Sequence, residues 1–232
     1  MTSPTPRAFV GTPSGTTDAT SFAITLPTHE AGDTLGICLV SDGTPGISCT
    51  GWTQIQSGAT AGSTAKGFIF VKDEVAASSS ETNPTFISDG AQQYAAIAFS
   101  IPGAAKLNVE ASSGANGLST SPDPPSFSPS GGSQDYLWLA FAATDNGSGI
   151  TVTGVPSGYT EPATISGGVA NGNGNGCTAG LAYKQSTASS DDPSAFTLAL
   201  GEQWGAFTVA IWGTGTPAPT SRGATLALMG VG

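Results

Sequence analysis

The chain has few charged residues and few of the side chains on which enzymes most often rely. Lysine, arginine, aspartate and glutamate together make up 9% of its 232 residues, and it has one histidine and three cysteines. It lacks any apolar run near the ~20 residues of a membrane-spanning helix. It begins Met-Thr-Ser-Pro-Thr-Pro-Arg, without the basic and apolar regions of a secretory signal. We therefore expect no membrane-spanning segment and no such signal.

Basic residues are especially scarce. Six lysines and arginines stand against sixteen acidic residues, so the formal net charge is −10, and no basic cluster occurs anywhere. Contacts to phosphates supply most of the affinity of proteins for nucleic acids, so we expect no nucleic-acid partner. The same charge disfavours anionic membrane surfaces, and its simplest role is resistance to non-specific association.

Cysteine and histidine are too few and too scattered for a disulfide framework or a zinc site. Cys38, Cys49 and Cys177 are expected to be reduced, buried or half-buried side chains in or beside strands, with a Cys38–Cys49 bridge as the minor alternative. The histidine, His29, lies in a loop-like stretch, and no Gly-x-Ser-x-Gly nucleophile elbow occurs. Triads are recognised by geometry, but nothing in the sequence favours one. We expect no catalytic residue and no enzymatic activity.

Acidic turns suit calcium better than any other metal, because carboxylate and carbonyl oxygens are its ligands. The two richest turns, at 145–149 and 190–193, lack the alternating spacing of an EF-hand loop and contain Asn-Gly and Asp-Pro pairs typical of ordinary turns. We therefore expect no metal and no cofactor, with calcium as the one metal that the composition leaves open.

The chain does have the composition of an all-β protein. Its 33 glycines and 16 prolines interrupt β-rich runs with period-2 alternation, and no window of about 11–18 residues has helical apolar spacing. The predicted strands lie near residues 9–10, 21–26, 34–41, 53–56, 65–72, 85–88, 94–101, 107–111, 125–128, 136–143, 158–161, 177–185, 195–200 and 204–212.

Five short phrases recur in the same order further along the chain, with offsets between 102 and 112 residues. Five collinear pairs at a nearly constant offset predict a structural repeat. The pairs are Asp33-Thr34-Leu35 with Asp135-Tyr136-Leu137, Gly51-Trp52-Thr53 with Gly158-Tyr159-Thr160, Phe70-Val71-Lys72 with Ala182-Tyr183-Lys184, Asn83-Pro84 with Asp192-Pro193, and Gln93-Tyr94-Ala95-Ala96-Ile97 with Gln203-Trp204-Gly205-Ala206-Phe207.

Strands at this spacing predict an antiparallel β-sandwich of jelly-roll or Greek-key type, built from an internal duplication. We expect a first repeat at 1–103, a second at 104–214, and a Pro/Thr linker with an apolar arm at 215–232. Two arrangements stay open. The repeats form either two closely packed sandwiches with pseudo-twofold character or one continuous sandwich.

Features that depart from the repeat are the candidates for binding. The 224–232 arm is apolar and uncharged, and it is either a final strand of the chain's own sheet or an arm that adds to a neighbour's sheet edge. A Gly- and Asn-rich insertion at 167–176 is predicted to be a surface loop or hairpin extension. The residues of the arm that we expect to bind a partner are Ala224, Thr225, Leu226, Leu228, Met229 and Val231.

Trp52 and Tyr159 occupy equivalent positions, each after a glycine and before a threonine. Such residues either plug equivalent ends of a core or, when exposed in loops, stack on sugar rings. The repetition favours the core, since both copies keep an aromatic residue there. The sugar-stacking role stays open as a ligand-binding alternative.

Six phrases of the chain point to a family. They are Ala-Gly-Asp-Thr-Leu-Gly-Ile-Cys-Leu-Val-Ser-Asp-Gly, Gly-Trp-Thr-Gln-Ile, Tyr-Ala-Ala-Ile-Ala-Phe-Ser-Ile-Pro-Gly-Ala, Pro-Asp-Pro-Pro-Ser-Phe, Asp-Tyr-Leu-Trp-Leu-Ala-Phe-Ala and Glu-Gln-Trp-Gly-Ala-Phe-Thr-Val-Ala-Ile. These phrases resemble β-rich structural proteins of tailed bacteriophages, over roughly residues 20–214. The resemblance brings no catalytic motif with it.

For this chain the resemblance implies a virion protein made in the host cytoplasm: a capsid decoration (cement) protein, a head spike or fibre, or a tail-associated protein. Its partners would be the major capsid protein or other virion proteins, and copies of itself in a homo-oligomer. The alternative is a tail-associated adhesin or carbohydrate-binding module that contacts a host glycan.

Overall fold

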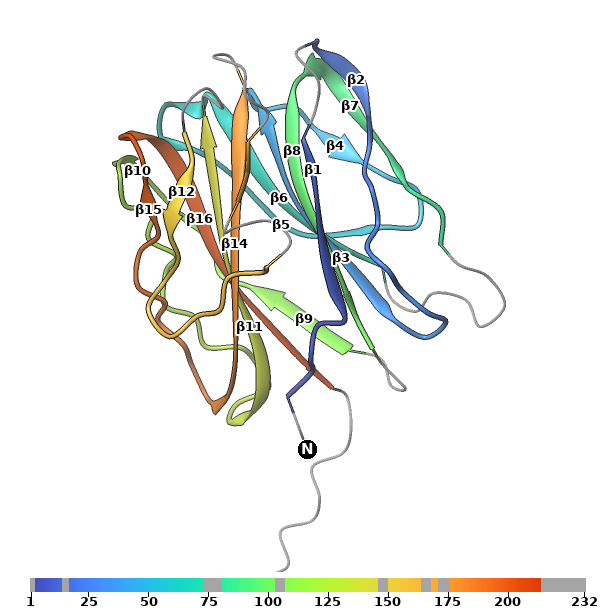
Figure 1. Cartoon of the computed structure of the whole chain (residues 1–232), viewed down its shortest axis with the longest axis vertical. Helices are drawn as coiled ribbons and strands as arrows, with labels where there is room; N and C mark the ends of the chain where they lie inside the picture. Colours follow the sequence, from blue (N-terminus) through green and yellow to red (C-terminus); the bar gives the residue numbers. More distant parts are fainter. Residues whose placement is uncertain are drawn as a thin grey trace, which may run out of the picture.

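A computed structural model describes residues 3–13, 17–72, 81–102, 107–145, 150–163, 168–170 and 176–213. Regular structure in these ranges is antiparallel β-sheet, apart from one turn of 3-10 helix, η1 (Ala61–Ser63). No helix within them is long and apolar enough to cross a membrane. The prediction of an all-β antiparallel fold is confirmed (Figure 1).

The first large sheet has five strands in the order β1-β8-β3-β6-β5. Its central strand, β3, carries the run Leu-Gly-Ile-Cys-Leu-Val and is buried on both faces, as is typical of a strand covered from two sides. The five strands are β1 (Ala8–Pro13), β3 (Thr34–Asp42), β5 (Thr53–Ala59), β6 (Ala65–Lys72) and β8 (Tyr94–Ile101).

The second large sheet has the order β10-β16-β11-β14-β13, and β9 also pairs with β16. Its three long strands each have twelve residues, and the central one, β11, is buried along nearly its whole length. The strands are β9 (Leu107–Ala111), β10 (Ala115–Ser119), β11 (Gln134–Asp145), β13 (Gly168–Ala170), β14 (Cys177–Ala188) and β16 (Glu202–Gly213).

The two large sheets have corresponding strand orders. β3 lies between β8 and β6 as β11 lies between β16 and β14, and β1 pairs with β8 as β9 pairs with β16. The structure thus shows the same order of paired strands in both large sheets. The jelly-roll topology and an origin by duplication stay predictions.

The two large sheets face each other over one central core. Ile97 and Phe99 from the first sheet and Leu139 and Val209 from the second belong to one cluster of buried side chains. Burial of apolar surface on this scale is the dominant favourable contribution to folding. Each half of the chain thus supplies one sheet of the central sandwich. The expected boundary between residues 103 and 104 lies outside the described residues.

The outer face of each large sheet has a cover of its own, so the molecule has four layers (Figure 1). A three-stranded sheet, β2 (Ala19–Ala23), β7 (Thr85–Gln92) and β4 (Ile47–Ser48), places Phe22 and Phe86 against the first sheet. The pair β12 (Val152–Gly154) and β15 (Thr197–Leu198), with neighbouring loops, covers the second sheet. Phe196 is buried in that outer cluster.

Polar contacts also join the two halves. The Gln56 side-chain amide donates to the Ser112 carbonyl at 2.6 Å, and the Thr64 hydroxyl donates to Gln203 Oε1 at 3.1 Å. The Gln185 amide donates to the carbonyl of Pro4 at 2.8 Å. These bonds brace the sandwich at its edges and hold the segment before β1 on the second half.

The strand prediction was wrong at several places. Residues 125–128 and 158–161 form only the isolated bridges Phe127 with Asp191 and Thr160 with Tyr183. The strands β4, β10 and β12 were not predicted, and β13 lies within the stretch predicted to be a surface loop or hairpin extension. These short strands are held by long-range pairing, which local sequence signals do not report.

Candidate functional site

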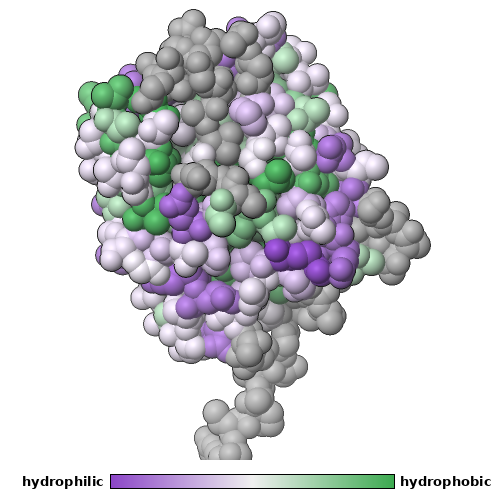
Figure 2. All heavy atoms as spheres, viewed as in Figure 1, coloured by the Kyte–Doolittle hydropathy of each residue, from purple (hydrophilic) through white to green (hydrophobic). Residues whose placement is uncertain are grey.

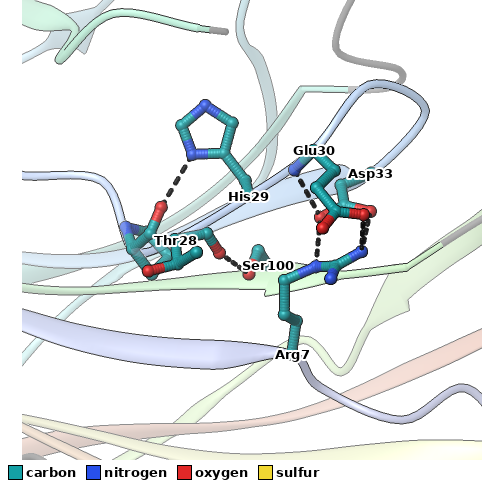
Figure 3. Close-up of polar contacts among 7 residues, drawn as sticks. Arg7, Thr28, His29, Glu30, Asp33 and Ser100 are labelled. Carbon is teal, nitrogen blue, oxygen red and sulfur yellow. Dashed lines mark hydrogen bonds and ion pairs between the residues drawn. The ribbon is translucent and has the colours of Figure 1, made fainter.

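His29 lies in the loop before β3, where its Nδ1 is 2.7 Å from the Pro27 carbonyl oxygen. Its Nε2 is buried and has no hydrogen-bond partner within the described ranges. Figure 3 shows the ring directed away from the neighbouring carboxylates. The Ser100 hydroxyl donates to the Thr28 carbonyl at 2.8 Å. The described surroundings therefore do not assemble a Ser–His–Asp arrangement around this histidine.

An ion pair next to this loop fastens β1 to the start of β3 (Figure 3). Arg7 Nε lies 2.8 Å from Asp33 Oδ2, and the Asp33 side chain is only 3% exposed. The Glu30 amide donates to the same oxygen at 3.0 Å, and the Glu30 carboxylate pairs with Arg7. The hydrogen bond to Asp33 raises the pKa of the Arg7 guanidinium. The buried carboxylate is fully engaged, so the cluster's role is to hold the chain together.

Trp52 and Tyr159, the two candidate ligand-loop aromatics, are buried in the two outer clusters with 9% and 8% of their surface exposed. The ring of Trp52 lies 5.7 Å from that of Phe86, measured between centroids. Sugar stacking needs an exposed ring face, which neither residue offers. Trp52 thus packs in the cluster outside the first sheet and Tyr159 in the cluster outside the second.

Tyr159 takes part in a compact polar cluster with Asp191 and Lys184. Its hydroxyl donates to the Asp191 carboxylate, which also accepts from the Lys184 ammonium. That ammonium lies 4.9 Å from the centroid of the Tyr159 ring. Burial raises the pKa of Tyr159, and the hydrogen bond to Asp191 and its negative charge raise it further.

This cluster bears on the calcium alternative. Asp191 belongs to the acidic turn at 190–193, and its carboxylate is already neutralised by Lys184. Within the described residues, no group of three or more His, Cys, Asp or Glu side chains is placed to hold a metal ion. The other acidic turn, at 145–149, lies outside the described residues except for Asp145.

Two aspartates end the central strands of the two sheets: Asp42 ends β3 and Asp145 ends β11. Burial raises the pKa of Asp42 to about 6, and the negative charges of Asp145 and Asp18 add to the shift. The carboxylates of Asp42, Asp145 and Asp18 therefore repel one another at neutral pH, where the ends of β3 and β11 lie close together. No local pattern predicts this proximity, because Asp18, Asp42 and Asp145 lie far apart along the chain.

The three cysteines are all free, so the alternative of a Cys38–Cys49 bridge is wrong. Cys38 and Cys177 are buried in the central core, and burial raises the pKa of both thiols. The Cys177 thiol donates to the Val40 carbonyl at 3.4 Å, which joins the second sheet to the first. Cys49 is half-buried.

Exposed apolar surface is concentrated at one edge of the second sheet. The exposed large apolar side chains of the described residues are Ile87, Leu118 and Leu200. Leu118 lies in β10, and Leu200 lies two residues before β16, the strand with which β10 pairs. Figure 2 shows strongly apolar atoms at the upper left, where Figure 1 places β10. We call the strand β10 with Leu118 and Leu200 the β10 edge.

Sequence reasoning missed the β10 edge because Asn-Gly inside Ala-Asn-Gly-Leu-Ser is a turn signal. The predicted partner-binding residues at 224–231 lie outside the described residues. Of the predicted insertion at 167–176, residues 168–170 form β13 beside β14, and 171–175 lie outside the described residues.

Comparisons of the chain with protein-family models, with curated proteins and with solved structures find no match.

Proposed function

We propose that the chain is a non-enzymatic structural protein of a tailed-phage virion, namely a capsid decoration (cement) or head spike protein. In this role it binds the capsid lattice and neighbouring copies of itself. The observation that carries the proposal is the β10 edge, an uncharged strand with the exposed Leu118 and, next to the strand with which it pairs, the exposed Leu200, on an otherwise acidic molecule. Exposed apolar surface of this kind commonly marks a site of association.

The rest of the fold supports a static role. The polar clusters around Asp33 and Asp191 tie separate segments of the chain together. The two large sheets share one core, and each has a second cover outside. Such bracing suits a protein that must keep its shape while it contacts a lattice. The six phrases that resemble phage structural proteins point in the same direction.

The alternative of a tail-associated adhesin has less support. It requires Trp52 and Tyr159 to form a sugar-binding platform, and both rings are buried. A glycan array with the purified full chain tests this alternative directly. Selective glycan binding would favour the adhesin and count against a purely structural role.

The proposal is tested on virions of the phage that encodes the chain. Mass spectrometry of gradient-purified particles should detect the protein, and cryo-electron microscopy should place its density on the head. A second assay mixes purified protein with empty capsids and measures saturable binding. Absence from purified virions, or density confined to the tail, would overturn the proposal.

A further inference from the structure

β10 lacks the protections that edge strands usually have. It pairs with β16 on one side, and no strand within the described ranges pairs with its other side. Natural edge strands are commonly protected from further pairing by charged side chains, proline or bulges. The sequence of β10 is Ala-Asn-Gly-Leu-Ser, with no charge and no proline, and its five rungs with β16 show no register shift.

Each of the other edge strands of the two large sheets either has one of these protections or is very short. β13 has only three residues. β1 ends in Pro13, and β9 carries Glu110, whose carboxylate accepts a hydrogen bond from the Ser130 amide. β5 has a register shift between Gln54 and Gln56. Among the edge strands of the two large sheets, β10 is therefore the one most open to pairing with an added strand.

The leucines make the same edge favourable for an apolar partner. Leu118 is 72% exposed and Leu200 is 57% exposed. Ser119 pairs with Glu202, and a Cβ built on Gly201 would lie 3.8 Å from the Ser119 carbonyl carbon, so the segment that carries Leu200 runs beside the end of β10. A strand that pairs with β10 would remove the Leu118 side chain from water.

The chain itself carries a segment with complementary chemistry. Residues 224–231 read Ala-Thr-Leu-Ala-Leu-Met-Gly-Val, without charge, and Leu226 and Leu228 fall on one face of an extended strand. Arg222 is the only charged residue after Glu202, whereas the chain as a whole has sixteen acidic residues. The segment itself is uncharged, and Arg222 shortly before it is opposite in sign to the net charge of the molecule, −10.

The place where the chain leaves the second sheet indicates that a strand added to β10 would come from a second copy of the chain. β10 pairs with the first part of β16, up to Ala206, while the chain leaves β16 at Gly213. These points lie roughly 23 Å apart along the strand at ~3.3 Å per residue. β9 occupies the edge between them. The chain's own segment would have to run back along β9 through a spacer that contains Pro217 and Pro219.

We propose that residues 224–231 of one copy add as a strand to the β10 edge of a second copy. Main-chain hydrogen bonds would supply affinity, and Leu226 and Leu228 would pack against Leu118. The inference rests on the part of the proposed function that concerns contacts between copies, and it does not depend on the capsid.

The test separates donor from acceptor with two variants of the full chain. Leu118→Lys places a charge on the acceptor edge, and deletion of residues 221–232 removes the donor. Ile87→Lys is the matched control, because Ile87 is 53% exposed on β7, in a different sheet. Self-association is measured by sedimentation velocity over a range of protein concentrations, and thermal unfolding confirms that each variant is folded.

We expect wild type and Ile87→Lys to self-associate alike, and each of the other two variants to associate at least about tenfold more weakly. An equimolar mixture of those two should form a one-to-one heterodimer, because one supplies the strand and the other the edge. If Leu118→Lys fails to fold, Leu200→Lys takes its place.

Three results would overturn the inference: a monomeric wild type, unimpaired self-association of both variants, or a mixture that stays monomeric. A photo-crosslinker at position 228 adds an independent readout, and crosslinks confined to a single chain would also overturn it. Because these assays use the purified protein alone, they can fail while the virion proposal stands, and the reverse holds too.

Discussion

The ring of Phe99 fills the space beside Gly36 in the central core. The two residues pair directly across β8 and β3, and a Cβ built on Gly36 would lie 1.9 Å from Phe99 Cζ. Glycine at this position lets an aromatic side chain pack against the backbone of the neighbouring strand. Phe99 is one of the largest fully buried side chains, so the contact lies where packing is tightest.

Gly36→Ala is therefore expected to lower the free energy of unfolding by about 1–3 kcal/mol, the usual cost of overpacking. The added methyl group would force the Phe99 ring out of its place or push the strands apart. Urea denaturation measures the change as a lower midpoint at an unchanged slope.

Gly213→Ala is the matched control, since a Cβ there would meet nothing within 4 Å. It should change stability by less than about 0.5 kcal/mol. The double variant Gly36→Ala/Phe99→Leu should cost less than the sum of the single changes, because the smaller side chain relieves the clash. Equal midpoints for Gly36→Ala and Gly213→Ala would contradict the packing argument.

The repeated phrases predicted which strands of the two sheets correspond. In β3 and β11 they misaligned the corresponding residues by one position. Ile101 pairs with Thr34, and Ile211 pairs with Leu137, so Thr34 corresponds to Leu137. The phrase match instead aligned Leu35 with Leu137, one residue away. Because side chains alternate between the two faces of a strand, a shift of one residue assigns the side chains of the central core to the outer cover and the reverse.

The ladders agree with the phrases elsewhere. Thr53 pairs with Val71 as Thr160 bridges to Tyr183, and these are the partners that the phrases matched. In the phrases Gly51-Trp52-Thr53 and Gly158-Tyr159-Thr160, a glycine and an aromatic residue fix the alignment. In the Asp33 phrase, a common pattern of apolar residues fits two registers equally well.

The short edge strands and the clustered side chains could not be predicted from local signals. β10 and β13 contain Gly and, in β10, Asn-Gly, which favour turns, yet pairing with β16 and β14 makes them strands. The proximity of Asp42 to Asp145 follows from the packing of two sheets. The β10 edge likewise exists only once β16 is in place.

The three thiols should differ sharply in reactivity. Cys38 and Cys177 are completely buried, and Cys49 is half-buried. Since only an accessible thiolate reacts, a colorimetric disulfide reagent should label Cys49 alone in the native protein and all three cysteines in denaturant. Burial raises the pKa of Cys49 as well, so its labelling should be slower than that of a free thiol. Cys49→Ser is the control and should abolish native labelling; rapid native labelling of two or three thiols would contradict the buried positions.

Lys184 should matter more to stability than Lys72, its counterpart in the first half. Lys184→Met leaves the Asp191 carboxylate, 11% exposed, without its cation, whereas the Lys72–Glu81 pair is 23% exposed on both sides. We expect a loss of about 2–3 kcal/mol for Lys184→Met, because an unpaired buried charge is costly. Lys72→Met should lose less, about 1 kcal/mol, because Glu81 is more exposed to solvent than Asp191. Urea denaturation of both variants checks the ranking, which equal losses would contradict.

The stability of the fold should depend on Asp42 in mildly acidic solution. The folded-state pKa of Asp42, about 6, is above its ordinary value of 3.8, so the folded chain binds this proton more tightly than the unfolded chain. The penalty is fully present above about pH 6 and disappears as pH falls towards about 4. Asp42 is partly exposed, so solvent screening limits the effect to about 1 kcal/mol.

Asp42→Asn removes the charge and should therefore stabilise the protein at pH 7 but not at pH 4, with the difference from wild type growing between those values. Urea denaturation across this range measures it, and the comparison with wild type cancels the contributions of the other carboxylates. Glu161→Gln, at an exposed position, is the control and should run parallel to wild type. If Asp42→Asn also runs parallel to wild type, burial and the neighbouring carboxylates do not raise the pKa of Asp42 as the structure indicates.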